Sequence, residues 1–297
     1  MTAKKLKKLF FLLLLILCAC AGRPGRAEAG SDRHFLWKVQ DGPGVVFLLG
    51  SVHLAPRDLY PLDAALEDAY RASERLVVEA DINSVDHERF QALIMSGAVY
   101  PEGDGVENHL SAKTKDKISA SGLDLAAFGR SRPWLIAITL QAERLHALGF
   151  EEKFGLDQHF LDRARKDGTP ILELESVDYQ INLFLNLTER EQDMFLYETL
   201  VELDHLEGMV AGLVQAWRVG DEDGFTKIFF KGYQENPELW PLADKIIFDR
   251  NRDMADKIAG FLAGGGNSLV IVGAAHLVGE RGLLELLRQR GARVEQW

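Results

Sequence analysis

The chain has 297 residues, of which 34 are Lys or Arg and 45 are Asp or Glu, giving a formal charge of −11; 47% are hydrophobic. This composition excludes wholesale disorder and fibrous repeats, and the acidic balance excludes a general nucleic-acid binder. The two cysteines are Cys18 and Cys20, so a disulfide scaffold and thiolate chemistry in the remaining chain are excluded as well.

The N-terminus has the pattern of an export signal. Lysines between positions 4 and 8 precede an apolar run, Leu9–Leu17, that is too short to span a bilayer comfortably. The following Leu17-Cys18-Ala19-Cys20 resembles a bacterial lipobox, so residues 1–19 are predicted to be a lipoprotein-type signal peptide. An ordinary signal peptide cleaved near Ala21 or Ala29 is the alternative.

Cleavage before Cys20 would leave a lipid on its sulfur. Residues 20–33, rich in Ala, Gly, Arg and Pro, are then predicted to be a flexible tether. These features predict an exported, periplasmic protein that is anchored to the membrane through Cys20.

Residues 34–297 are predicted to form a single domain that begins with a hairpin and a crossover. Apolar runs at 35–39 and 45–49 flank the turn sequence Asp41-Gly42-Pro43-Gly44. Helical spacing over 62–73 and a buried run at Arg75–Ala80 follow. The order strand, helix, strand indicates a right-handed parallel crossover.

The rest of the chain alternates in the same way. Further strands are expected at Pro170–Glu175, Leu269–Val272 and Ala292–Gln296, and helices at 155–167 and 279–290. The stretch 84–262 is mostly helical by periodicity, and its long pattern over 188–219 is broken near Gly208 and Gly212. The predicted fold class is α/β, with a central mixed, largely parallel sheet formed from the N- and C-terminal parts and a large helical insertion at about 84–262.

Two matched motifs carry the candidate chemistry. Gly50-Ser51-Val52-His53 and Gly273-Ala274-Ala275-His276 each follow a buried strand. A single histidine after a strand is usually a structural residue. Because the carboxyl ends of parallel strands meet at one edge of a sheet, two matched copies favour a shared site containing both histidines.

Acidic residues are expected at the same edge. Glu79 lies in an apolar strand, and Glu173 and Glu175 alternate along another, so that they point to one face. A buried carboxylate is costly unless it is paired or binds a metal, and an ion pair between Glu79 and Arg250 is the alternative to a ligand role. Imidazole and carboxylate ligands suit Zn, Mn, Co or Fe, which can activate water.

The residues at these positions also resemble a known family. The chain resembles the TraB/GumN family, whose relatives include the Tiki proteases. The resemblance is carried by Leu36-Trp37-Lys38-Val39, Gly50-Ser51-Val52-His53-Leu54, Val77-Val78-Glu79-Ala80-Asp81, Gly155-Leu156-Asp157, Leu174-Glu175-Ser176 with Gln180, Arg250-Asn251 and Val272-Gly273-Ala274-Ala275-His276-Leu277 followed by Gly279 and Gly282-Leu283. The wider superfamily also holds erythromycin esterases and a haem-binding lipoprotein, and it implies an α/β sheet with a metal-dependent site at the strand ends.

The resemblance also implies roles for individual residues. His53 and His276 match the metal-site histidines, and Glu79 a ligand or general base. Arg250 and Glu175 match catalytic positions, where Arg250 would orient Glu79 or stabilise an oxyanion or a substrate carboxylate. The remaining matched positions, with a cofactor-binding role, are Asp157, Gln180 and Asn251. Asp157, at the start of a helix, is expected first of all to be an N-cap.

These observations predict a metal-dependent hydrolase of the peptidase type. A divalent cation (Mn, Co, Zn or Fe) held by His53, His276 and Glu79 would activate water against a peptide or small-molecule substrate. One alternative is a non-catalytic haem- or metal-binding lipoprotein. Another is an interaction protein that uses the helical insertion and retains a relic of the site.

Overall fold

The computed structural model describes residues 34–297. The predicted signal peptide, the tether and the lipid site Cys20 lie outside the described residues. Among the helices of 34–297, none combines the length and the apolar character needed to cross a membrane.

The centre of the fold is a six-stranded sheet in the order β6-β4-β7-β2-β1-β8. Its strands are β1 (Leu36–Asp41), β2 (Gly44–Ser51), β4 (Arg75–Val78), β6 (Ile171–Glu173), β7 (Gly266–Gly273) and β8 (Arg293–Gln296). Strands β6, β4, β7 and β2 are mutually parallel, and β1 is antiparallel to β2 and β8. The predicted α/β class with a mixed, largely parallel sheet is confirmed. Strand β7, from the C-terminal part of the chain, lies between β2 and β4, so distant parts of the chain form the centre of the sheet.

The hairpin forms as its turn sequence predicts. Asp41 pairs with Gly44, which leaves a two-residue turn in which Gly42 has a φ of +80°. Strand β2 then runs the full length of β7, and the parallel register pairs Ser51 with Gly273. The two strand exits that carry the Gly-x-x-His motifs therefore lie side by side.

The helices fill the stretches between the strands. The α-helices are α2 (Ala64–Arg71), α3 (His87–Ala98), α4 (Ala112–Ser121), α5 (Pro133–Ala147), α6 (Leu156–Asp167), α7 (Val177–Leu185), α8 (Glu189–Glu202), α9 (Leu206–Arg218), α10 (Glu222–Glu235), α11 (Trp240–Ala243), α12 (Asp249–Gly264), α13 (Ala274–Leu277) and α14 (Leu283–Gln289). A π-helical turn, η7 (Asp244–Phe248), joins α11 to α12. Two short strands, β3 (Ala55–Pro56) and β5 (Phe150–Glu151), form a separate antiparallel pair.

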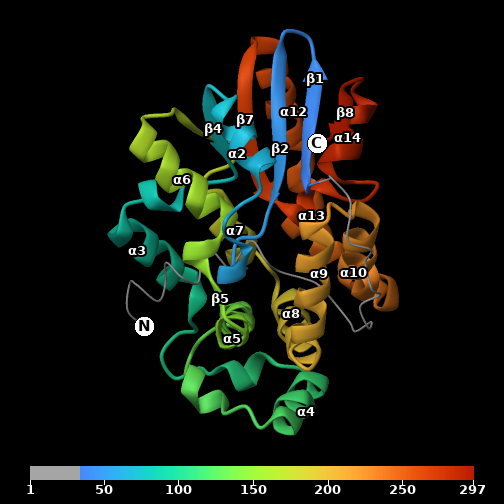
Figure 1. Ribbon diagram of the computed structural model, residues 1–297. Helices are drawn as coiled ribbons and strands as arrows, with labels where there is room; N and C mark the ends of the chain where they lie inside the picture. The colour runs from blue at the N-terminus through green and yellow to red at the C-terminus, as the bar shows by residue number, and fades with distance from the viewer. Residues whose placement is uncertain (1–33) are drawn as a thin grey trace.

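The sheet and most of the helices occupy different parts of the molecule (Figure 1). The hairpin turn of β1 and β2 lies at the top of the view, and β2 runs down toward α5, α8 and α9. Helix α12 packs against β1, β2 and β7, and α2 and α6 pack against β7 and β4. The carboxyl ends of the parallel strands thus face the helical part of the molecule, and the space between them is where the candidate site lies.

One helical boundary differs from its prediction. The break in 188–219 falls at 203–205, between α8 and α9, while Gly208 and Gly212 lie inside α9. Gly212 lies at a close contact with α10, since a Cβ there would be 3.1 Å from the end of the Ile228 side chain, whereas Gly208 has no such neighbour. Neither glycine ends a helix.

Candidate functional site

The two motif histidines converge at the carboxyl ends of β2 and β7. His53 lies two residues beyond β2, and His276 lies in the short helix α13 that begins directly after β7. Both are 3% exposed. Because β2 and β7 are adjacent and in parallel register, the two imidazoles reach the same buried volume, as the sequence predicted.

Gly273 makes this convergence possible. A Cβ at this position would lie 2.9 Å from Nε2 of His53 and 3.4 Å from Oε1 of Glu79. The first distance is too short for a side chain to be accommodated without moving the imidazole. The glycine of the second motif thus leaves room for a histidine of the first, which explains why this residue type stands at the strand exit.

The carboxylate of Glu79 lies between the two rings. Glu79 follows β4 directly and is 2% exposed. Its Oε1 is 3.9 Å from Nε2 of His53 and 3.8 Å from Nε2 of His276, and it accepts a 2.6 Å hydrogen bond from the backbone N–H of Gly273. One carboxylate oxygen from the exit of β4 therefore faces three groups from the exits of β2 and β7.

Each histidine is oriented from behind by an oxygen. Nδ1 of His276 lies 2.6 Å from Oδ1 of Asn251, and Nδ1 of His53 lies 2.8 Å from Oδ1 of Asp157. Ser51 donates its hydroxyl hydrogen to the same Asp157 oxygen. Because Oδ1 of Asn251 accepts the proton on Nδ1, the Nε2 lone pair of neutral His276 faces Glu79, whereas Asp157 lies close to Nδ1 of His53 without a hydrogen bond of good geometry.

Arg250 fixes the far side of Glu79. Its guanidinium donates to Oε2 of Glu79 at 2.6 Å, to Glu175 at 2.6 and 2.9 Å, and to the backbone carbonyl of Ile246 at 2.9 Å. Gln180 bridges both carboxylates, donating to Glu79 at 3.1 Å and to Glu175 at 3.0 Å. The ion pair between Glu79 and Arg250 considered as an alternative is therefore present, and it exists together with the approach of Glu79 to both histidines.

The surroundings determine the ionisation of Glu79 and of the two histidines. Burial would raise the pKa of Glu79, but positive charge on His276, Arg250 and His53 and the Gly273 N–H lower it to about 2. Burial lowers the pKa of His276 to about 3, so this ring is neutral at pH 7. Burial also opposes charge on His53, but Asp157 and Glu79 outweigh it and raise its pKa above 6.5.

All eight residues named as site candidates lie in one connected, largely buried group. The structure also shows contacts of individual residues that the sequence did not reveal. Asp157 is not the N-cap of α6: Gly155 holds that position without a side-chain bond, and Asp157 lies in the first turn with its carboxylate turned to His53. Glu173 is exposed and accepts from the backbone N–H of Asp81, away from Arg250.

Two imidazoles and a carboxylate, from His53, His276 and Glu79, are ligand types that bind divalent cations. Within residues 34–297, no group of three or more His, Cys, Asp or Glu side chains could hold a metal ion as they are placed. Two ligands of one ion with bonds of about 2.1 Å can be no more than about 4.2 Å apart, so spacings of 3.8 and 3.9 Å from Glu79 lie near the wide limit. Both ring nitrogens of His53 are buried without a hydrogen-bond partner among the described residues, and Nε2, which faces Glu79, is therefore available to a cation.

A cavity of about 90 Å³ opens beside this group. Ser51, His53, Arg250, Gly273 and His276 line one part of it. Most of the remaining lining is apolar and comes from α9, α10 and η7. The site thus has space for a ligand next to its polar residues, which is the usual construction of a binding pocket.

Comparison with known proteins identifies a family for the chain. The sequence model of the TraB/PrgY/gumN family matches residues 35–296. The chain belongs to the TraB/PrgY/gumN family. Similar members of known sequence include the uncharacterized protein YbaP of Escherichia coli (strain K12) and YbaP of Shigella flexneri, each 26% identical over 263 residues that cover 86% of this chain and 94% of YbaP.

An uncharacterized protein of Treponema pallidum (strain Nichols) is 20% identical over 306 residues, covering 94% of this chain and 89% of that protein. No solved structure matches the chain. TraB/PrgY/gumN membership therefore rests on nearly the whole of the described chain, and the chemistry has to be argued from the site itself.

Proposed function

We propose that this protein is a metal-dependent hydrolase, of the peptidase type, whose divalent cation is held by His53, His276 and Glu79. The observation that carries the proposal is the approach of both Nε2 atoms to the same oxygen, Oε1 of Glu79, at 3.9 and 3.8 Å. Asn251 turns the lone pair of His276 toward Glu79, and Asp157 lies close to Nδ1 of His53.

This convergence favours a cation because it brings acceptors together. At a pH above the raised pKa of His53, two lone pairs and one negative oxygen face each other in a buried volume, and below that pH the proton on His53 supplies the positive charge. Such an arrangement is costly unless a positive charge lies between the acceptors. Mn, Co, Zn and Fe all accept imidazole and carboxylate ligands, so the donor set supports a divalent metal of this group without selecting one.

The remaining residues of the site prepare Glu79 for this role. A bound divalent cation would supply a nucleophile from water near neutral pH and polarise a substrate carbonyl. With a pKa of about 2, Glu79 is a poor proton acceptor at pH 7 but a permanent negative ligand. Arg250 touches Glu79 and Glu175 together, so we assign Arg250, Glu175 and Gln180 to positioning Glu79.

A hydrolysis screen with matched variants tests the activity. The wild-type protein, supplied in turn with Mn, Co, Zn and Fe, is incubated with a random peptide library, and products are detected by mass spectrometry. We expect cleavage by the wild type and by Asn236→Ala, a half-buried position outside the site, and loss of cleavage in His276→Ala. Equal cleavage by His276→Ala, or no cleavage with any of these metals, would contradict the proposal.

The size of the cavity favours a hydrolase over a haem-binding protein. Its volume of about 90 Å³ is well below the roughly 300–1,000 Å³ of sites that enclose drug-sized ligands or cofactors. It suits one side chain of a substrate. A haem titration that produced an absorbance band dependent on His53 or His276 would reverse this preference.

We also propose that the protein is exported and held at the membrane by a lipid on Cys20. The support is the sequence Leu17-Cys18-Ala19-Cys20 after a basic and apolar leader. Metabolic labelling with a tagged fatty acid should label the wild type and not Cys20→Ser. Equal labelling of Cys18→Ser and wild type is the expected control, and an unlabelled wild type would contradict the proposal.

A further inference from the structure

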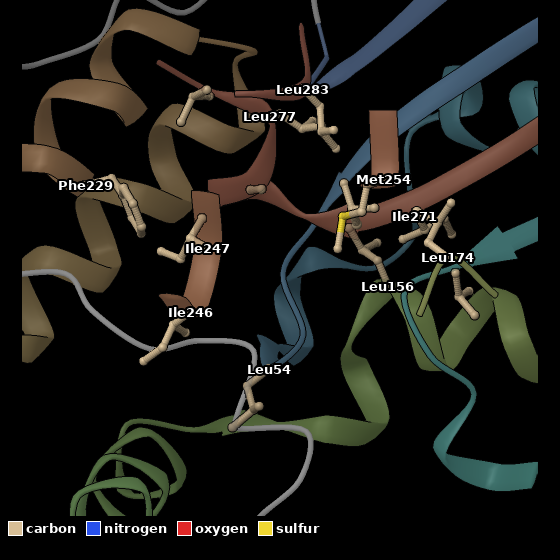
Figure 2. Close-up of a cluster of buried hydrophobic side chains, with 14 of the residues drawn as sticks. Leu54, Leu156, Leu174, Phe229, Ile246, Ile247, Met254, Ile271, Leu277 and Leu283 are labelled. Carbon is tan, nitrogen blue, oxygen red and sulfur yellow. The ribbon is translucent and has the colours of Figure 1, made fainter. Parts of the chain in front are cut away.

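The cavity beside the histidines extends toward a second polar group that the proposed chemistry does not use. Its walls are apolar and include Leu54, Phe229, Ile246 and Ile247, which Figure 2 shows on the loop after β2, on α10 and on η7. Gln141 on α5 and Glu202 at the end of α8 line the same cavity. A buried carboxyl in this apolar setting calls for an explanation.

Glu202 and Gln141 have unused acceptors. They are 2% and 5% exposed, and the amide of Gln141 donates a long 3.3 Å hydrogen bond to Oε2 of Glu202. Oε1 of Glu202 and Oε1 of Gln141 are buried and have no hydrogen-bond partner among the described residues. Leaving two buried oxygens without hydrogen bonds is unfavourable. A ligand that donates a hydrogen bond to each of them would remove this cost on binding.

We propose that this cavity is a recognition pocket for a short alkyl chain that ends in a primary ammonium group, as a lysine side chain or an aliphatic amine does. The proposal deepens the proposed function, because it names the substrate feature that the hydrolase site would select. The alkyl part lies against the apolar walls, and the ammonium group donates to Glu202 and Gln141.

The charge around Glu202 favours an ammonium group over other polar groups. Burial and the neighbouring Glu198 raise the pKa of Glu202 well above its usual range, as expected for a carboxyl that lacks a cation. The positive charge of Lys113 favours the ionised form of Glu198, and no such cation acts on Glu202 among the described residues. An ammonium group offers three donors and a positive charge, whereas a hydroxyl offers one donor and a ligand carboxylate would be repelled.

The position and size of the cavity favour a side chain. Residues of the histidine site and Glu202 line one cavity, so a chain bound at Glu202 lies in the same cavity as His53 and His276. About 90 Å³ accommodates a narrow chain and excludes a large ring system. A substrate with a lysine-like side chain beside the cleaved bond meets both conditions.

Calorimetric titration with hexylamine and with hexan-1-ol tests the pocket without using hydrolysis or a metal. We expect hexylamine to bind the wild type and the exposed control Glu102→Gln with similar Kd, and hexan-1-ol to bind at least tenfold more weakly. Glu202→Gln should bind hexylamine at least tenfold more weakly while keeping the circular dichroism spectrum of the wild type. Filling the pocket by Met209→Trp should weaken both ligands.

Three results would overturn the proposal. One is equal binding of hexylamine by Glu202→Gln and the wild type, and another is a Kd for hexan-1-ol as low as that for hexylamine. Failure of hexylamine to bind the wild type would also overturn it. Because the titration uses neither a metal nor hydrolysis, its outcome is separate from the metal and cleavage measurements that test the hydrolase proposal.

Discussion

Oδ1 of Asn251 accepts a hydrogen bond from Nδ1 of His276 at 2.6 Å, while the amide of Asn251 donates to the carbonyl of Arg281 at 2.8 Å. The second bond identifies the oxygen of the side chain, because only the amide nitrogen can donate to a carbonyl. The proton of neutral His276 is therefore on Nδ1, and its Nε2 lone pair faces Glu79. A residue on α12 thus sets the chemistry of a ring on α13.

Removing this acceptor should weaken metal binding while leaving all three ligands in place. For Asn251→Ala we expect a loss of 10- to 100-fold in metal affinity, the usual effect of deleting a residue that orients a ligand. Competition with a fluorescent chelator measures the affinity. Asn236→Ala is the matched control and should bind the metal as tightly as the wild type does. An unchanged metal affinity in Asn251→Ala would contradict the role of Asn251 in orienting His276.

Breaking the buried ion pairs of Arg250 should destabilise the fold strongly. Arg250→Ala leaves Glu79 and Glu175 buried without their cation, and we expect a loss of about 3–5 kcal/mol in the free energy of unfolding. Arg71→Ala, which breaks an exposed pair with Asp68, should cost about 0–1 kcal/mol. Urea denaturation compares the two, and similar losses for both variants would contradict the account.

Glu79 should make the protein sensitive to acid. Its pKa is about 2 in the folded chain against 4.5 for the free side chain, so the folded state binds fewer protons in this range. The stability that Glu79 contributes is complete above 4.5 and is lost as the pH falls from 4.5 to about 2. The difference in unfolding free energy between wild type and Glu79→Gln should shrink over this interval. A constant difference would show that the pKa of Glu79 is not lowered in the folded state.

Glu202 should have the opposite effect from Glu79 on how stability depends on pH. Its pKa is raised in the folded state, so it destabilises the fold increasingly as the pH rises above 4.5 toward its folded value. Replacing it by Gln removes this penalty, and we expect Glu202→Gln to be more stable by about 1–3 kcal/mol at neutral pH. Thermal and urea unfolding at several pH values measure the gain, and a variant less stable than the wild type would contradict the reading.

The sheet was largely predictable because its strands are short apolar runs with clear ends. The turn at Gly42, the helix stop at Gly168 and the strand ending at Gly273 are local signals that hold in the structure. The meeting of His53 with His276 follows from one topological rule, since adjacent parallel strands end at one edge. The sequence could therefore identify which residues converge.

The supporting contacts were less predictable because they depend on packing between distant helices. The carbonyl of Ile246 reaches Arg250 from a π-helical turn, a geometry that has no simple sequence signal. Asp157 occupies a helix start, where capping is the usual role, and only the position of His53 shows its actual contact. Glu202 resembles a surface residue of an amphipathic helix until α5 and α8 are packed together.

The central claim is that His53, His276 and Glu79 hold one divalent cation, and the metal content of the purified protein tests it most directly. Protein prepared without chelator is analysed by plasma mass spectrometry alongside His53→Ala and His276→Ala, with circular dichroism to verify folding. The account predicts close to one ion per wild-type chain and almost none in either folded variant. Equal metal content in all three proteins, or a wild type that takes up no metal when it is supplied, would contradict it.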